Sequence, residues 1–213
     1  MKIGKLLTSA AVGAAVVFSG FAANAGNIQH INPEVAVFSG EIVDGDLKML
    51  EKYFHKNPTT ETIYLKSPGG LLDEGLDIGR FFAKKLYLHV AVHKSDLCMS
   101  ACAFAFLGGN NQHINGKLGF HKAYATNKVD ELEGGQVVGA ATFSYIMEMG
   151  YNSSLAYIIL TKTDRDMFLR IEKKADLDYF FVKKDTASIK NMLEPVGVNN
   201  NWLSENLVKG SSM

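Results

Sequence analysis

The 213-residue chain lacks the features of very small and of disordered proteins. It contains only two cysteines, four prolines and one tryptophan. Two cysteines are too few for a disulfide-dense scaffold. A composition of 47% hydrophobic and 21% charged residues is typical of a chain that buries a core. The sequence therefore predicts a globular protein.

The chain also has no excess of charge of either sign. Its 22 basic and 22 acidic residues give a formal net charge of zero. Proteins that bind nucleic acids usually carry a basic face with aromatic residues between the charges. The charge balance therefore argues against a nucleic-acid partner.

Patterns that hold metals or phosphates are missing. Cys98 and Cys102 stand four apart, without histidines at the spacing of a zinc site. His89 and His93 fall on an expected strand and at its end, not on one face of a helix. The glycine pair that starts at Gly108 follows an expected helix, whereas a phosphate-binding loop would precede one. We therefore expect no metal and no cofactor.

Long apolar stretches are confined to the N-terminus. Lys2 and Lys5 precede a mostly apolar, uncharged run from Leu6 to Phe21, and Ala23-Asn24-Ala25 places small residues at the positions of a cleavage site. This order predicts a secretory signal peptide over residues 1–25, cleaved before Gly26. The alternative is an uncleaved anchor, since the run approaches the roughly 18 residues that a spanning helix needs. Its alanine, glycine and serine content favours cleavage.

The remainder, residues 26–213, is expected to form a single domain in the periplasm or outside the cell, without stable membrane insertion. Strands are expected over residues 35–39, 62–65 and 86–92, and helices over residues 46–55, 72–83, 100–107, 137–149, 154–162 and 187–193. Right-handed crossovers between such strands build a mostly parallel sheet with active-site loops at the strand ends. The alternation therefore predicts an α/β fold, with a mostly parallel sheet flanked by helices.

Three short strings could supply a Ser-His-Asp triad in chain order. They are Cys98-Met99-Ser100-Ala101-Cys102, Gly119-Phe120-His121, and the segment from Thr163 to Leu169. A serine in the first turn of a helix lies beside free N–H groups, and an imidazole with an ordinary pKa of about 6.5 can accept its proton at neutral pH. A carboxylate then orients the imidazole. We expect Asp166 in this role, with Asp164 as the alternative, because loop geometry decides between them.

Each of these residues also has a purely structural interpretation. Ser100 is equally placed to cap a helix. His121 is a candidate for a core histidine bonded to backbone, and Asp166 for an ion pair with Arg165 or Arg170. The turn Ser67-Pro68-Gly69-Gly70, which follows an apolar strand, either simply reverses the chain or presents N–H groups to a developing oxyanion.

These strings together give the chain a family resemblance. It resembles the proteolytic subunit of Clp-type serine peptidases, in the Clp/crotonase superfamily, and especially its exported ClpP-like relatives. The resemblance rests on the stretches 35–42 and 63–70 and on Thr163-Asp164-Arg165-Asp166-Met167-Phe168-Leu169, which is similar to the family's Thr-Glu-Arg-Asp-x-Phe-Leu segment. It covers nearly the whole mature chain and implies repeated ββα units.

By this resemblance Ser100 matches the nucleophile, His121 the base and Asp166 the acid. The N–H groups of Gly69 and Ala101 match the oxyanion hole. The resemblance thus implies a serine endopeptidase that cleaves peptides or unfolded proteins and assembles as a homo-oligomer. Export would separate it from ATP, so we expect no ATPase partner.

Two other functions remain open at the level of sequence. One is a catalytically inactive ClpP-like fold that serves as a binding or assembly module. The other is crotonase-type chemistry on a thioester, which would use the same oxyanion amides without Ser100.

The redox state of the two cysteines flanking Ser100 is also open. Residues four apart on a regular helix have Cβ atoms about 5–6 Å apart, whereas a disulfide needs about 3.8 Å. A bridge between Cys98 and Cys102 therefore requires Cys98 to lie before the helix. Such a bridge would fix the turn that presents Ser100; the alternative is a pair of reduced, buried thiols.

Overall fold

The computed structural model describes residues 25–124, 131–182 and 197–213. Its strands are β1 (Asn27–Asn32), β2 (Val35–Ser39), β3 (Thr62–Lys66), β4 (His89–Val92), β5 (Leu97–Met99), β6 (Asn111–Ile114), β7 (Lys117–Phe120), β8 (Met167–Ile171) and β9 (Leu207–Lys209). Its helices are α1 (Asp46–Lys56), α2 (Leu72–Ala83), α3 (Ala101–Leu107), α4 (Glu131–Glu148), α5 (Ser153–Lys162), α6 (Lys174–Asp178), α8 (Asn200–Asn206) and the 3-10 helix η1 (Gly210–Ser212).

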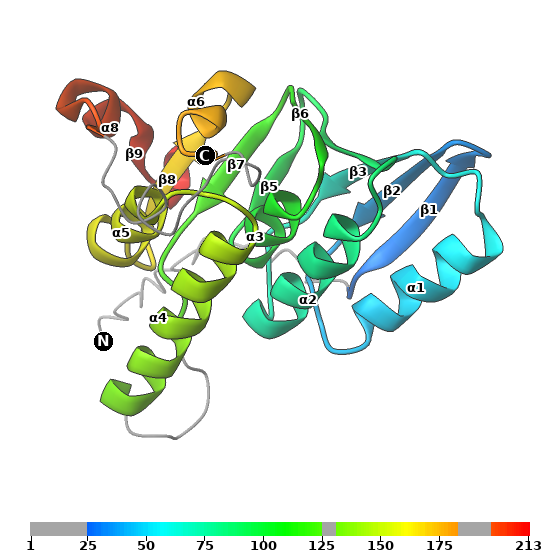
Figure 1. Cartoon of the computed structure of the whole chain (residues 1–213), viewed down its shortest axis with the longest axis horizontal. Coiled ribbons are helices and arrows are strands. Elements are labelled where there is room, and N and C mark those ends of the chain that lie inside the picture. The colour runs from blue at the N-terminus through cyan, green and yellow to red at the C-terminus, as the bar shows by residue number, and fades with distance from the viewer. Residues whose placement is uncertain (1–24, 125–130, 183–196) are drawn as a thin grey trace, which may run out of the picture.

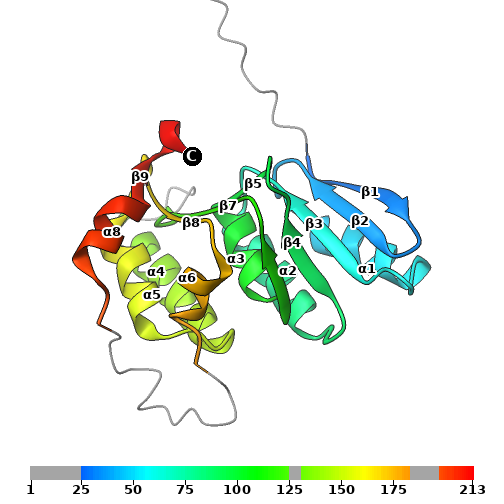
Figure 2. The same cartoon turned by 90° about the horizontal axis from the view of Figure 1, so that it is seen from above.

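The first sheet has the strand order β1-β2-β3-β4-β6, in which all neighbours are parallel except the hairpin of β1 and β2. Its side chains alternate between two faces, as β geometry requires. Ala36 and Phe38 on β2, and Ile63 and Leu65 on β3, are buried on one face. Helices α1 and α2 cover that face (Figures 1 and 2).

The second sheet has the order β5-β7-β8-β9 and is mixed. Strands β5 and β7 are parallel, whereas β7, β8 and β9 are antiparallel neighbours. Helices α4 and α5 lie at the end of the molecule that this sheet occupies, away from β1 (Figure 2). The predicted α/β fold with helices flanking a mostly parallel sheet is confirmed, and the antiparallel half of the second sheet is an addition to it.

Several predicted boundaries were wrong. The strand expected from Leu86 begins only at His89, because Leu86 is 74% exposed and the N–H of Leu88 donates to the carbonyl of Lys85 in a turn. The helix expected from Ser100 begins at Ala101, and α4 starts at Glu131, six residues before the expected position. The expected signal peptide, apart from residue 25, and the helix expected over residues 187–193 lie outside the described residues.

The backbones of helices α2 and α3 approach each other closely, because both helices carry small residues where they are in contact. A Cβ on Gly75 of α2 would lie 2.6 Å from the carbonyl oxygen and 2.9 Å from the Cβ of Ala101 in α3. One turn further along, a Cβ on Gly79 would overlap the hydroxyl of Tyr145 and lie 3.3 Å from the Cα of Ala105. All seven residues of α3 are buried. Gly75 therefore sets how closely the N-terminus of α3 approaches α2.

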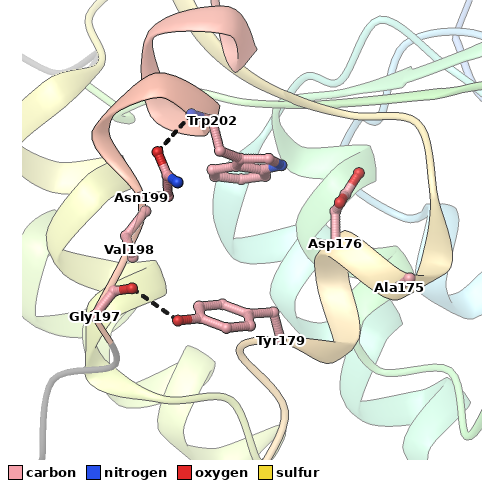
Figure 3. A pocket seen from close by; sticks show the side chains of 7 residues that line it. All are labelled: Ala175, Asp176, Tyr179, Gly197, Val198, Asn199 and Trp202. Carbon is pink, nitrogen blue, oxygen red and sulfur yellow. Dashed lines mark hydrogen bonds between the residues drawn. The ribbon is translucent and has the colours of Figure 1, made fainter.

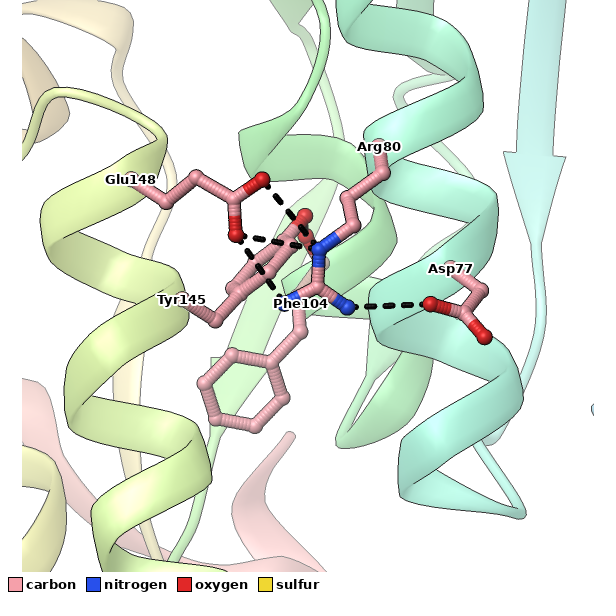
Figure 4. Close-up of polar contacts among 5 residues, drawn as sticks. All are labelled: Asp77, Arg80, Phe104, Tyr145 and Glu148. Atoms are coloured by element: carbon pink, nitrogen blue, oxygen red, sulfur yellow. Dashed lines mark hydrogen bonds and ion pairs between the residues drawn. The ribbon is translucent and has the colours of Figure 1, made fainter.

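A polar cluster joins α4 to α2 and α3 (Figure 4). The guanidinium of Arg80 donates to Glu148 at 2.9 and 3.0 Å and to Asp77 at 2.9 Å, and it lies over the ring of Tyr145. The hydroxyl of Tyr145, which is fully buried, donates to the carbonyl of Phe104 at 2.8 Å. Burial raises the pKa of Tyr145 well above its ordinary value, so this hydroxyl remains a donor at any physiological pH.

No helix within the described ranges is long and apolar enough to cross a membrane.

The close approach of α2 and α3 predicts opposite effects for two Gly→Ala changes. Gly75→Ala should lower the free energy of unfolding by about 1–2 kcal/mol, because the clash with the Ala101 backbone outweighs the gain in helix propensity. Gly139→Ala in α4 should raise it by up to about 1 kcal/mol, because no atom lies within 4 Å of the new Cβ. Urea denaturation of both variants measures these differences, and a stabilising Gly75→Ala would contradict the close packing.

Candidate active site

Ser100 has a backbone conformation that L-amino acids rarely adopt. With φ 55° and ψ −125°, it is the only non-glycine residue with positive φ in the described parts of the chain. Such a conformation costs about 1–3 kcal/mol and persists only where the surroundings impose it. Here the N–H of Ser100 donates to the carbonyl of Gly119 at 2.7 Å, and the carbonyl of Ser100 accepts the N–H of Phe104 at 3.2 Å.

A disulfide joins the two sides of this residue. Cys98 on β5 and Cys102 in α3 are bonded, with Cα atoms 5.2 Å apart, and both side chains are buried. The bridge is geometrically allowed because Cys98 lies in a strand and not in the helix. The bridge therefore tethers the end of β5 to the first turn of α3 across Ser100.

The structure brings Ser100 and His121 together. Strand β5 runs parallel to β7 with Met99 opposite Gly119, so the residues that follow these strands emerge side by side. The Oγ of Ser100 and the Nε2 of His121 are 2.7 Å apart. Ser100 makes no capping hydrogen bond with its side chain, so its hydroxyl is engaged by the imidazole and not by the helix.

The environment of His121 favours its neutral form. Its ring packs against Phe168, with ring centroids 4.7 Å apart, and is half-buried. Burial lowers the pKa of His121, while the backbone of Lys122 and the charge of Asp164 raise it to a smaller extent. A neutral imidazole can accept the Ser100 proton. Its other nitrogen, Nδ1, is buried and has no hydrogen-bond partner among the described residues.

No hydrogen bond joins the carboxylate of Asp166 to the ring of His121 within the described residues. The carboxylate of Asp164 closes the turn by accepting the N–H groups of Asp166 and Met167, both at 2.9 Å. The carbonyl of Asp166 in turn accepts the N–H of Gly210. These bonds tie the backbone of Asp166 to the C-terminal segment. The charge of Asp164, the alternative that the sequence left open, contributes a small upward shift to the pKa of His121.

The glycine turn lies directly against the serine. A Cβ on Gly69, whose φ is +101°, would lie 2.6 Å from both the Met99 carbonyl oxygen and the Ser100 Cβ. The backbone of buried Ser67 donates to the carbonyl of Leu97 and accepts the N–H of Met99, so it pairs with β5. Its side-chain Oγ accepts the N–H of Gly69 at 3.1 Å. The expected oxyanion donor Gly69 is therefore engaged within its own turn. Ala101 is the first residue of α3, where an N–H has no acceptor within the helix.

Sequence reasoning missed two residues beside His121. Two residues before His121, Gly119 leaves space that the terminal methyl group of Met213 fills, so the C-terminal segment packs on β7. Phe168 stood within the quoted acidic string, but its packing on His121 depends on the antiparallel pairing of β7 and β8. Across the described ranges, no three His, Cys, Asp or Glu residues are grouped to hold a metal ion.

Comparisons with known proteins extend this picture. No protein-family model and no curated protein sequence matches the chain. Among solved structures, a variant of a membrane-bound stomatin-specific protease has a TM-score of 0.52 at 19% identity, over 70% of this chain and 77% of that one. A variant of ClpP1 from Listeria monocytogenes has a TM-score of 0.52 at 18% identity, over 72% and 94% of the two chains. The ClpP catalytic domain from Plasmodium falciparum has a TM-score of 0.50 at 14% identity, over 80% and 90%.

These similarities establish the fold of the chain. The chain shares the fold of these ClpP-like proteases, as the sequence resemblance implied.

Reduction of the disulfide should affect Ser100 more than global stability. The bridge closes a short loop, worth about 2 kcal/mol, so its loss should lower the melting temperature by about 4–8 °C. Without the tether the strained Ser100 backbone can relax, and modification of Ser100 by a fluorophosphonate probe should slow about tenfold or more. Equal probe rates with and without reductant would contradict this role, as would two free thiols in denatured protein isolated without reductant.

The burial of His121 predicts a titration midpoint below 6.5, measurable from its ring proton signals by NMR. Since the unfolded state then binds the proton first, His121 should reduce stability as the pH falls below 6.5 and have no effect above it. Asp164→Asn should lower the midpoint further, because the carboxylate charge raises the pKa. Asp166→Asn is the matched control and should leave it unchanged. A midpoint above 6.5 would contradict the dominance of burial.

Proposed function

We propose that this chain is a serine peptidase that uses Ser100 as its nucleophile. The observation that carries the proposal is the 2.7 Å contact between Ser100 Oγ and His121 Nε2 at a residue held in strained backbone geometry. Strained residues are concentrated at functional sites. The fold shared with ClpP-like proteases supports the same reading.

In the proposed reaction, His121 accepts the hydroxyl proton while Ser100 Oγ attacks the carbonyl carbon of a peptide bond. The carbonyl oxygen becomes an oxyanion, for which the N–H of Ala101 at the start of α3 is the nearest free backbone donor next to Ser100. His121 then returns the proton to the leaving amine. Water, activated by the same imidazole, releases the acyl group from Ser100.

A second oxyanion donor requires a small rearrangement. The Gly69 N–H donates to Ser67 Oγ at 3.1 Å, although the glycine itself touches Ser100. We propose that substrate binding draws this N–H toward the oxyanion. The orienting carboxylate in our proposal is Asp164, because its charge acts on His121 and its own turn holds it in place.

The proposed substrates are peptides or unfolded protein segments, in an exported compartment and without an ATPase partner. The disulfide supports this location, because disulfides persist mainly in oxidising compartments. The predicted signal peptide agrees with it, and we retain homo-oligomeric assembly as part of the proposal.

One observation favours a second candidate, the inactive binding module. The Nδ1 atom of His121 has no hydrogen-bond partner among the described residues, whereas a working triad uses that atom to orient the imidazole. In that case Ser100 would resist fluorophosphonate labelling even in oxidised, folded protein.

Kinetics of peptide cleavage test the proposal. Ser100→Ala and His121→Ala should each lower kcat/KM by at least about a thousandfold, and the double variant should be no worse than either, because such residues act as a unit. Asp164→Asn should lower kcat about tenfold or more, and Asp166→Asn, the matched control, should have a smaller effect.

Three outcomes would contradict parts of this scheme. Full activity in Ser100→Ala would place the nucleophile elsewhere. A loss of kcat/KM in the double variant equal to the product of the two single losses would mean that Ser100 and His121 do not act in one mechanism. A larger effect for Asp166→Asn would restore the assignment that the family resemblance implied.

A further inference from the structure

A separate cavity of about 340 Å³ lies between α6 and α8. It is lined by Ala175, Asp176, Tyr179, Gly197, Val198, Asn199 and Trp202 (Figure 3). None of these residues belongs to the Ser100 and His121 site. The volume is at the lower end of the range of pockets that hold small ligands, about 300–1,000 Å³.

The aromatic walls of the cavity are held in place by contacts within the protein. Figure 3 shows the rings of Trp202 and Tyr179 on two sides of the opening. The Tyr179 hydroxyl donates to the Gly197 carbonyl at 2.8 Å, and the ring of Trp202 packs on buried Phe180 with centroids 6.0 Å apart. The side chain of Asn199 caps α8 by accepting the N–H of Trp202. The walls are therefore preorganised, which reduces the entropy lost when a ligand binds.

The charge of the lining selects the ligand. Asp176 is the one charged residue in the lining that the structure describes, and Figure 3 shows its carboxylate beside the opening. Asp176 makes no ion pair within the described parts of the chain, whereas Asp178 on the same helix pairs with Lys174. The faces of tryptophan and tyrosine rings attract cations. The cavity thus combines two cation-attracting rings with one available carboxylate.

We propose that this cavity binds an alkylammonium group, with the aliphatic part against Trp202 and Tyr179 and the charged end at Asp176. Among the described residues, no basic side chain lines the cavity, so this lining offers no partner for the carboxylate of a free amino acid. Two sources fit this chemistry: the side chain of a lysine within a peptide, and a small quaternary amine. The inference does not depend on peptidase activity.

Trp202 provides a direct measurement, because it is the only tryptophan in the chain. The probes are N-acetyl-lysine methylamide, tetramethylammonium, and the neutral N-acetyl-norleucine methylamide, titrated into the oxidised protein while Trp202 fluorescence is recorded. We expect saturable changes with a cationic probe and at least about tenfold weaker binding of the neutral one. Tighter binding of the lysine derivative points to a peptide, and tighter binding of tetramethylammonium points to a small amine.

Substitutions on one helix supply the matched control. Asp176→Asn should weaken binding of the better cationic probe about fivefold or more, and Asp178→Asn, which does not alter the cavity lining, should leave it unchanged. Circular dichroism and thermal melts establish that both variants fold. Equal binding of the neutral probe, equal effects of the two variants, or no fluorescence response to either cation would overturn the proposal, whether or not the protein cleaves peptides.

Discussion

The forced backbone conformation of Ser100 is the constraint on which the site depends. Three restraints act on it from different directions: its N–H is bound by Gly119 on β7, its carbonyl begins α3, and the disulfide joins the residues two positions away on each side. Each restraint fixes different atoms. Together they direct the hydroxyl away from the helix and toward His121.

The conformation of Ser100 also depends on the position of α3, which contacts with α2 and α4 determine. The N-terminus of α3 can approach α2 this closely only because Gly75 has no side chain. Gly79 of α2 leaves room for the hydroxyl of Tyr145, which donates to the Phe104 carbonyl, and Arg80 holds the helix that carries Tyr145. Small residues in α2 and the polar cluster on α4 thereby set the position of the N-terminus of α3, where an oxyanion would be stabilised.

The His121 site and the cavity between α6 and α8 treat charge in opposite ways. At His121, burial outweighs the nearby carboxylate and keeps the imidazole neutral, as a proton acceptor requires. At the cavity between α6 and α8, Asp176 is left without an ion pair within the described residues, beside the rings of Trp202 and Tyr179. The first arrangement suits the proton transfer proposed for Ser100 and His121, and the second suits the proposed binding of a positive charge.

The sequence by itself determined the α/β class, the order of the main strands and helices, and the strings that contain Ser100 and His121, because hydrophobic periodicity and short motifs are local properties. Boundaries such as the start of β4 at His89 depended on tertiary packing. The choice between Asp164 and Asp166 could not be read from spacing, since both lie in one turn.

Only the tertiary structure decided the rest. The strained φ of Ser100 and the opposition of Met99 to Gly119 depend on contacts between segments distant in sequence. The disulfide joins residues only four apart, but it forms because Cys98 lies in β5 and not in α3. Neither periodicity nor composition encodes such pairings, because the register of strands and the approach of helices are settled only when the whole core packs.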